Sequence, residues 1–289
     1  MSVHLKNFID VTRLNKPVGF LLLFWPCSWG LSLALYFERN LNTFIYYLAL
    51  FFCGSLLMRS AGCIVNDIVD EGIDKKVLRT KNRPIASGSL KKNLAWFYVL
   101  ILCSLAFLIL VQFNLLTICL GMFSMIFAFS YPFMKKYTYW PQLFLGFTFN
   151  WGIVMAWTSI TNEISYLPVL LYIGAIFWTL GYDTIYGVQD ISDDEIIGVK
   201  STAIKFKNNL KFFVGCCYLI SSIVILFVMI NLEVNYSLIF LVFFTLTLLY
   251  QIKIFHVDSS ESCFRAFKLN NISGLMIFLG FFFLTIFNI

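Results

Sequence analysis

Carboxylates in two short stretches are the residues of this sequence best suited to chemistry. The stretches cover residues 66–74 and 183–194, and together they hold eight of the fifteen acidic residues. Both leave long apolar runs and lead into segments that contain Lys and Arg. Clustered carboxylates beside apolar segments are costly unless another charge offsets them. We therefore expect the clusters to hold divalent cations, which in turn bind an anionic group.

The first stretch places its polar side chains on one side of a helix. Asn66, Asp70 and Asp74 follow an i, i+4, i+8 pattern. Asp67 joins the two later aspartates at i, i+3, i+7, so that all four side chains project to one side. Unpaired carboxylates this close together would repel one another. A hard cation such as Mg²⁺ removes that conflict, because it takes oxygen ligands and is often shared with substrate phosphates.

The second stretch repeats this arrangement. Asp183, Asp190 and Asp194 follow an i, i+7, i+11 pattern, and Tyr186 lies between them in the sequence. Two such clusters facing each other would hold two Mg²⁺ ions that bridge a diphosphate. The alternative is that these acidic residues are simply solvated at a membrane–loop junction, which accounts poorly for two clusters with Asp-x-x-x-Asp spacing.

Basic residues near the acidic stretches suit the phosphates of such an anion. Arg79 and Arg83 follow the first stretch, and an Arg side chain can clamp phosphate oxygens with two donors. Lys200 follows the second stretch. A membrane-topology signal is the alternative explanation for these residues. It does not explain Arg59, which lies inside an apolar run before Asn66, so we expect Arg59 to face a cavity.

The composition is that of an integral membrane protein. Of the 289 residues, 60% are hydrophobic and 12% are charged, whereas about a quarter of a soluble domain is charged. We expect an all-α bundle of nine transmembrane helices around a central cavity, forming a single domain over residues 1–289, with a weak internal duplication of the acidic stretches. Apolar segments near the roughly 20 residues that span a bilayer cover residues 17–37, 44–65, 94–112, 114–131, 141–160, 166–183, 210–230, 235–254 and 270–288.

The basic residues follow the positive-inside pattern. With the N-terminus in the cytoplasm, 20 of the 21 Lys and Arg residues lie on the cytoplasmic side, and Arg39 alone lies opposite. Both Asp-rich loops then lie on the cytoplasmic side. Because topology explains the net charge of +6, nucleic acid is not an expected partner. Residues 1–16 show neither a cleavable signal nor a presequence pattern, which favours a bacterial inner (plasma) membrane.

The same residues carry a family resemblance. Residues 66–88 resemble the first signature of the UbiA-type intramembrane prenyltransferases, and residues 182–202 resemble the second. Three flanking pieces, at residues 13–19, 25–26 and 131–138, are similar to the 4-hydroxybenzoate polyprenyltransferase branch of that superfamily. The resemblance covers the whole chain.

This resemblance implies an enzyme embedded in the lipid bilayer. Its reaction would be the Mg²⁺-dependent transfer of a polyprenyl group from a polyprenyl diphosphate to the ring carbon ortho to the hydroxyl of 4-hydroxybenzoate, a step of ubiquinone biosynthesis. Asp70 and Asp190 are the leading catalytic candidates, and Asp190 is a candidate base for the ring proton. The implied cation ligands are Asn66, Asp70, Asp74, Asp190 and Asp194, to which the motifs add Asp67 and Asp183.

The remaining candidate residues are basic or aromatic. The family places a diphosphate-binding basic residue in the loop after the fourth span, where this sequence has Lys135-Lys136, and we assign that role to Lys136. The cation that holds the acceptor's carboxylate stays open among Arg13, Lys16, Arg59 and other basic residues. The diphosphate-binding candidates are Arg59, Arg79, Arg83, Lys136 and Lys200, and those for the acceptor or cavity are Arg13, Lys16 and Tyr186.

Other functions remain as alternatives. Within the superfamily the acceptor could be a naphthoate, homogentisate, chlorophyll or haem precursor. A divalent-cation transporter would place its acidic residues near the bilayer midplane, with broken helices there. A CDP-alcohol phosphotransferase would carry an Asp-Gly…Ala-Arg motif, which this sequence lacks. The sequence identifies no protein partner.

Overall fold

The computed structural model describes residues 3–232 and 236–286, and over these residues the chain forms helices joined by turns. The predicted all-α class is therefore confirmed. In chain order the elements are α1 Val3–Thr12, α2 Val18–Glu38, α3 Leu41–Val69, α4 Glu71–Asp74, α5 Lys92–Leu110, α6 Leu115–Tyr137, α7 Pro141–Asn150, α8 Gly152–Thr161, α9 Tyr166–Gly187, the 3₁₀ turn η1 Val188–Asp190, α10 Ile191–Ile197, α11 Thr202–Lys205, the 3₁₀ turn η2 Lys207–Asn209, α12 Leu210–Ile230, α13 Leu238–Ile254, α14 Ser260–Lys268 and α15 Asn270–Ile286.

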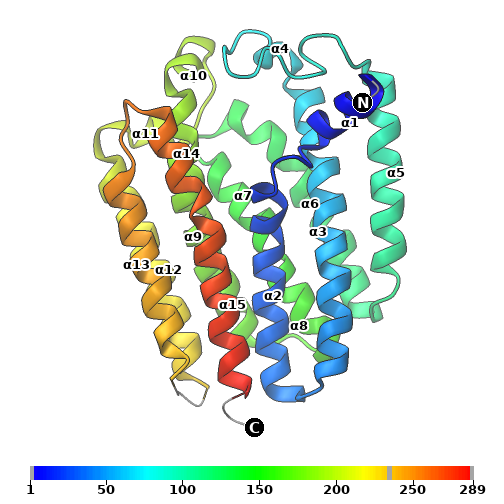
Figure 1. Ribbon diagram of the computed structural model, residues 1–289, viewed down its shortest axis with the longest axis vertical. Coiled ribbons are helices and arrows are strands. Elements are labelled where there is room, and N and C mark those ends of the chain that lie inside the picture. Colours follow the sequence, from blue (N-terminus) through cyan, green and yellow to red (C-terminus); the bar gives the residue numbers. More distant parts are fainter. Residues whose placement is uncertain (1–2, 233–235, 287–289) are drawn as a thin grey trace.

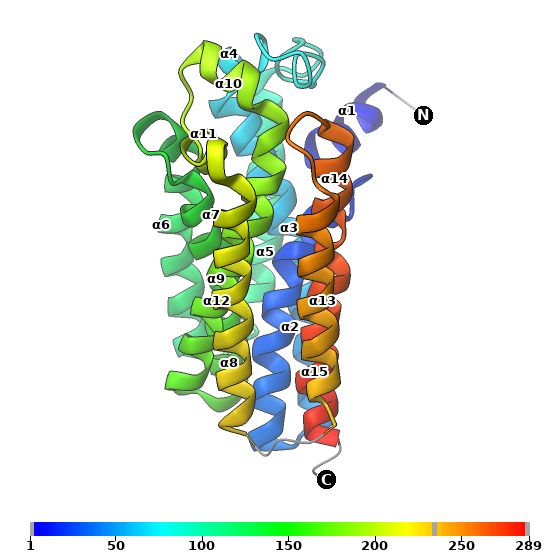
Figure 2. The ribbon, with the colours of Figure 1, turned by 90° about the vertical axis from the view of Figure 1, so that its left-hand side faces the viewer.

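The long helices run side by side along the long axis of the molecule (Figures 1 and 2). Within the described residues, eight helical segments are long and apolar enough to cross a membrane, and α13 is a shorter apolar helix. Each predicted apolar segment coincides with one of these helices or with two consecutive ones. Residue 235, at the start of one predicted segment, and residues 287–288, at the end of the last, lie outside the described residues. The chain is thus a multi-pass membrane protein.

Local sequence sets several helix boundaries. The side chain of Asn40 accepts a hydrogen bond from the Thr43 amide at 3.1 Å at the start of α3, and Asn114 accepts one from the Thr117 amide at 2.9 Å at the start of α6. Such caps satisfy backbone donors that a helix start leaves unpaired. The predicted break around residues 112–114 is confirmed, because α5 ends at Leu110 and α6 begins only after Asn114.

The centre of the bundle is packed closely around α2, α8 and α9. The rings of Trp29 and Trp178 lie 5.0 Å apart between centroids, and neither side chain is exposed. A Cβ atom at Gly30 would lie 2.3 Å from the Ile153 carbonyl oxygen, so only glycine allows α2 and α8 to approach this closely. The outer helices expose large apolar side chains, such as Leu108 on α5, as expected for contact with lipid.

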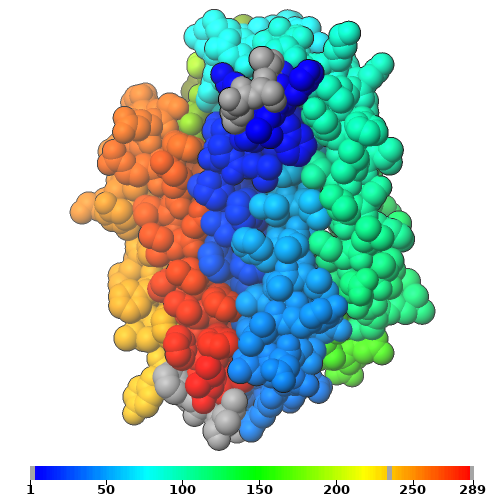
Figure 3. All heavy atoms as spheres, turned by 45° about the vertical axis from the view of Figure 1, so that its right-hand side comes forward, coloured from blue at the N-terminus to red at the C-terminus, as the bar shows by residue number. Residues whose placement is uncertain are grey.

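Both acidic stretches lie at one end of the bundle. Figure 1 shows α4 and α10 at this end together with α1, and Figure 3 shows the N-terminal segment, in blue, against the cyan segment that follows α3. This placement meets the requirement that the two stretches face one region. It also argues against a divalent-cation transporter, which would need acidic residues near the middle of the spans.

The acidic stretches do not each occupy one continuous helix, and that prediction was wrong. α3 ends at Val69, and Asp70 turns the chain, with φ −93° and ψ 1°, into the short α4. In the second stretch, η1 interrupts the path from α9 to α10. Asp is a weak helix former, and contacts with distant segments, described below, hold both turns. The carboxylates therefore surround the end of a cavity instead of forming one stripe.

Candidate active site

A polar cavity of about 680 Å³ lies between the two acidic stretches and the ends of α2, α3, α6 and α9 that are nearest to them. It collects most of the side chains that the sequence singled out. Asp67 and Lys136 are the predicted residues that do not line it. Those that do are Arg13, Lys16, Arg59, Asn66, Asp70, Asp74, Arg79, Arg83, Asp183, Tyr186, Asp190, Asp194 and Lys200.

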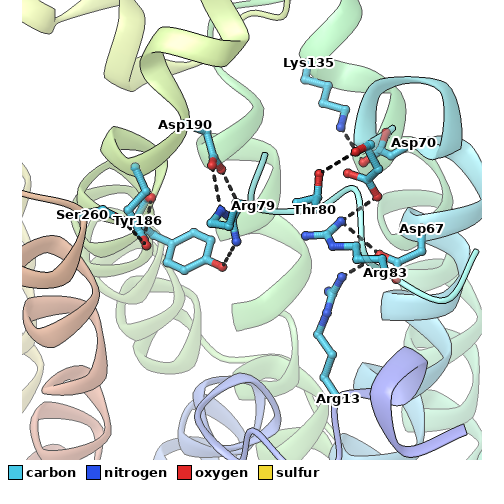
Figure 4. A network of polar contacts seen from close by, with 12 residues as sticks. Arg13, Asp67, Asp70, Arg79, Thr80, Arg83, Lys135, Tyr186, Asp190 and Ser260 are labelled. Atoms are coloured by element: carbon cyan, nitrogen blue, oxygen red, sulfur yellow. Dashed lines mark hydrogen bonds and ion pairs between the residues drawn. The ribbon is translucent and has the colours of Figure 1, made fainter. Parts of the chain in front are cut away.

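A bidentate ion pair links the first acidic region to the second. Arg79 donates from Nε to Asp190 Oδ1 at 2.8 Å and from Nη2 to Asp190 Oδ2 at 2.5 Å, as Figure 4 shows. Its Nη1 donates to the hydroxyl of Tyr186 at 3.2 Å. Burial lowers the pKa of Arg79, but the bonds to Asp190 and Tyr186 outweigh this effect and raise the pKa above its ordinary value. Arg79 is therefore a permanent cation at the cavity wall.

Lys135 forms the second pair, with Asp70. Burial raises the pKa of the Asp70 carboxyl above its ordinary value, and the charge of Lys135 opposes that rise. The other carboxylate oxygen, Asp70 Oδ1, is buried without a hydrogen-bond partner. Asp70, which lines the cavity, thus keeps one oxygen without a protein partner while Lys135 binds the other.

Lys136 is the predicted diphosphate-binding residue of the Lys-Lys pair, whereas the structure brings Lys135 to the cavity. The ammonium group of Lys136 lies over the ring of Phe133 at 5.9 Å from its centroid, away from the cavity lining. Helical spacing carries a signal for this choice: α6 continues to Tyr137, and Tyr131 and Lys135 are four residues apart on one face. Both of these residues line the polar cavity.

Replacing Lys135 with Ala should lower the prenyl transfer expected from the family resemblance by about 10- to 100-fold, because a hydrogen bond between charged groups contributes about 1.5–3 kcal/mol. The matched variant Lys136→Ala should keep activity within about twofold, since an exposed cation–π contact contributes only about 0.5–1 kcal/mol. Initial rates of both variants in the same membranes give the comparison. A larger loss in Lys136→Ala than in Lys135→Ala would contradict this assignment.

An apolar cavity, also of about 680 Å³, adjoins the polar one. It is lined by apolar side chains of α3, α5, α6 and α8, and four residues belong to both cavities: Arg59, Asn66, Tyr131 and Phe149. Arg59 lies over the ring of Phe149 at 5.4 Å, and its Nε is buried without a hydrogen-bond partner. Arg59 faces the cavity as predicted, at the junction between a charged chamber and an apolar one.

Basic residues pair with most of the clustered carboxylates. The sequence predicts unpaired carboxylates, but Asp67, Asp70, Asp74 and Asp190 each bind an Arg or Lys. Among the described residues, no three His, Cys, Asp or Glu side chains lie close enough to hold a metal ion by themselves. The donor set still fits Mg²⁺, because this ion commonly uses one or two carboxylates and completes its shell with phosphate and water. The specific observation in favour is the buried free oxygen of Asp70, because Asp70 lines the polar cavity, whereas Asp67, whose Oδ2 is also buried without a partner, does not.

These features define a class of protein: an all-helical membrane enzyme whose cavity suits a substrate with an anionic head and an apolar tail. A model of the UbiA prenyltransferase family matches residues 23–272, and the chain belongs to this family. It is 38% identical over 287 residues to a 4-hydroxybenzoate octaprenyltransferase of Vibrio atlanticus (strain LGP32), covering 98% of each chain. It is 38% identical over 283 residues to a mitochondrial 4-hydroxybenzoate polyprenyltransferase of Caenorhabditis elegans, covering 96% of this chain and 78% of the relative.

Solved structures share the fold. A UbiA homolog from Aeropyrum pernix K1, in its apo form, superposes with a TM-score of 0.75 at 20% identity, covering 90% of this chain and 96% of that one. A UbiA homolog from Archaeoglobus fulgidus bound to GPP and Mg²⁺ gives a TM-score of 0.71 at 16% identity, covering 95% of this chain and 98% of that one. At these identities the likeness shows the architecture alone.

Proposed function

We propose that this protein transfers a polyprenyl group from a polyprenyl diphosphate to the ring carbon ortho to the hydroxyl of 4-hydroxybenzoate and releases diphosphate. The observation that carries the proposal is the junction of the polar and apolar cavities, which suits a diphosphate head and a long apolar tail. The activity named for the relatives, which match nearly the whole chain, supplies the aromatic acceptor.

The polar cavity binds the diphosphate and its Mg²⁺. Arg79, Arg83, Lys135 and Lys200 provide positive charge on the wall. Mg²⁺ bound there would neutralise the negative charge that develops on the leaving diphosphate. We assign its ligation to residues from both acidic stretches, namely Asn66, Asp70, Asp74, Asp183, Asp190 and Asp194.

The reacting carbon belongs at the junction of the two cavities. There the carbon–oxygen bond to diphosphate breaks, and the faces of Tyr131 and Phe149 stabilise the positive charge left on the allylic carbon. The electron-rich ring carbon of the acceptor forms the new carbon–carbon bond. Its proton passes to a carboxylate of the cavity wall, for which we propose Asp190.

Arg59 is the cation we assign to the carboxylate of the acceptor. Arg13 is already bound to Asp67, and Lys16 is exposed at the cavity rim. Arg59 keeps a buried Nε donor without a partner, and a Cβ atom at Gly19 would lie 2.9 Å from that nitrogen. An anion bound to Arg59 would hold the acceptor ring beside Phe149.

The positive-inside pattern supports an orientation as well. We propose that the end with the acidic stretches faces the cytoplasm, in the inner membrane of a bacterium, since nearly all Lys and Arg residues then lie on that side. The anionic head group then binds at the cytoplasmic end, and the tail lies in the membrane-embedded part.

Membranes that contain the protein should convert radiolabelled 4-hydroxybenzoate and a polyprenyl diphosphate into a lipid-soluble product, and EDTA should abolish this conversion until excess Mg²⁺ is restored. The measurement is radioactivity in the organic extract, with membranes that lack the protein as the control. Product from a naphthoate or homogentisate acceptor, with none from 4-hydroxybenzoate, would overturn the assigned acceptor.

A further inference from the structure

Asp67 differs from its neighbours in the first acidic stretch in where it points. Its side chain is only 1% exposed, and it does not line the polar cavity, whereas Asn66, Asp70 and Asp74 do. Successive residues of a helix are rotated by about 100° around its axis. Asp67 therefore leaves α3 on a different side from Asn66 and lies behind the cavity wall.

Two guanidinium groups meet at this buried carboxylate. Asp67 Oδ1 accepts a hydrogen bond from Arg13 Nη2 at 2.6 Å and another from Arg83 Nη1 at 3.2 Å (Figure 4). The same Nη1 of Arg83 donates to Asp74 Oδ2 at 2.8 Å. One carboxylate thus joins the end of α3, the turn between α1 and α2, and the segment after α4.

Arg13, which makes one of these contacts, has an unusual backbone conformation. Arg13 has a φ of 56°, in the left-handed region that residues other than glycine rarely adopt. Nearby, Asn7 of α1 donates from Nδ2 to the Ser89 carbonyl at 3.0 Å. The N-terminal residues therefore contact the segment after α4 directly through Asn7, and they contact α3 through the charged pair Arg13–Asp67.

Charge balance explains why this position carries a carboxylate. Asp67 and Asp74 share the guanidinium group of Arg83, so the positive charge of Arg83 is divided between two carboxylates. Without the Asp67 charge, Arg13 would lose its carboxylate partner and Arg83 would keep only Asp74. Breaking one side of a buried ion pair is unfavourable because it leaves an uncompensated charge. Asp74 would then be held more firmly by Arg83 and would be less available to the cavity.

We propose that Asp67 is a positioning residue, which holds Arg13 and Arg83 so that Asp74 presents its oxygens to the cavity. It is not itself a ligand of the divalent cation, which replaces the role assigned to it from its motif. The inference rests on the proposed function, because it concerns the cation that this function requires.

Counting bound Mn²⁺ separates a positioning role from ligation. The probe is Mn²⁺ with inorganic pyrophosphate, added to the purified full-length protein and followed by electron paramagnetic resonance. Asp67→Asn should bind the wild-type number of Mn²⁺ ions at saturation, with the half-saturating concentration raised about tenfold or more. The matched variant Asp70→Asn should bind fewer ions at saturation. An equal loss of bound ions in both variants would overturn the proposal, as would an unchanged half-saturating concentration in Asp67→Asn.

A second variant tests the route through Arg13. Arg13→Gln breaks one contact of Asp67 and leaves that of Arg83, so it should raise the half-saturating Mn²⁺ concentration less than Asp67→Asn does, again without loss of bound ions. In the double variant the half-saturating Mn²⁺ concentration should rise by less than the product of the two single-variant fold-changes, because both residues act through one contact. Strict additivity contradicts the proposal. Failure of the proposed function is seen separately, as wild-type protein that binds Mn²⁺ but gives no prenylated 4-hydroxybenzoate.

Discussion

Replacing Asp70 with Asn should reduce prenyl transfer by about a thousandfold, while the protein still inserts into the membrane. The side chain keeps its size, but it loses the charge that binds Lys135 and one of the two oxygens, so it can no longer both bind Lys135 and offer a free carboxylate oxygen. Charge stabilisation by a bound metal contributes several kcal/mol to a transition state, and a loss of about 4 kcal/mol corresponds to about a thousandfold in rate. Product formation at saturating Mg²⁺ is the measurement.

Glu71→Gln is the matched control for that variant. Glu71 is the next residue in the chain, but it pairs with Lys75 and Lys92, and none of these three lines the polar cavity. Exposed ion pairs of this kind contribute about 0–1 kcal/mol, so this variant should keep nearly full activity. Near-normal activity of Asp70→Asn, or an equal loss in both variants, would refute the role given to Asp70.

Asp190→Asn should be comparably inactive, for two reasons. The substitution removes a carboxylate from the proposed ligand set and removes the group proposed to accept the ring proton. It also breaks the bidentate pair with Arg79, which joins the two acidic regions across the cavity. We expect a loss of at least about a hundredfold in kcat, in line with the contribution of a positioned proton acceptor. Single-turnover rates with prebound prenyl diphosphate measure it.

Asp193→Asn provides the comparison within the same acidic stretch. Asp193 lies in α10 between Asp190 and Asp194 in sequence, but it does not line the polar cavity. It should therefore keep activity close to that of the wild type. If Asp190→Asn keeps the single-turnover rate and changes only the concentration of prenyl diphosphate needed, the proton-accepting role is refuted and a role in binding remains.

Local features of the chain were sufficient to predict the class of protein and its helices. Apolar runs of membrane-spanning length are a property of consecutive residues, so α2, α5 and α12 could be located from the sequence alone. The residue types of the two acidic stretches likewise indicated a cation and a phosphate group before any geometry was known. Arg59 could be assigned to a cavity because a charged residue inside an apolar span requires a polar neighbour.

The choice between adjacent residues depended on the tertiary structure. Lys135 faces the cavity and Lys136 does not, because a rotation of about 100° per residue separates them and only packing decides which side is inward. The same rotation takes Asp67 away from the cavity, where the motif had placed it among the cation ligands.

By itself, the sequence determined which chemical groups are present and that they lie near the membrane surface. It could not determine their partners, since Arg79 and Asp190 are 111 residues apart and Arg13 and Asp67 are 54 apart. The turns at Asp70 and at η1 follow from such contacts, because an ion pair between distant segments can offset the cost of ending a helix. The tertiary structure therefore decided which carboxylates face the cavity and which of them hold the wall behind it.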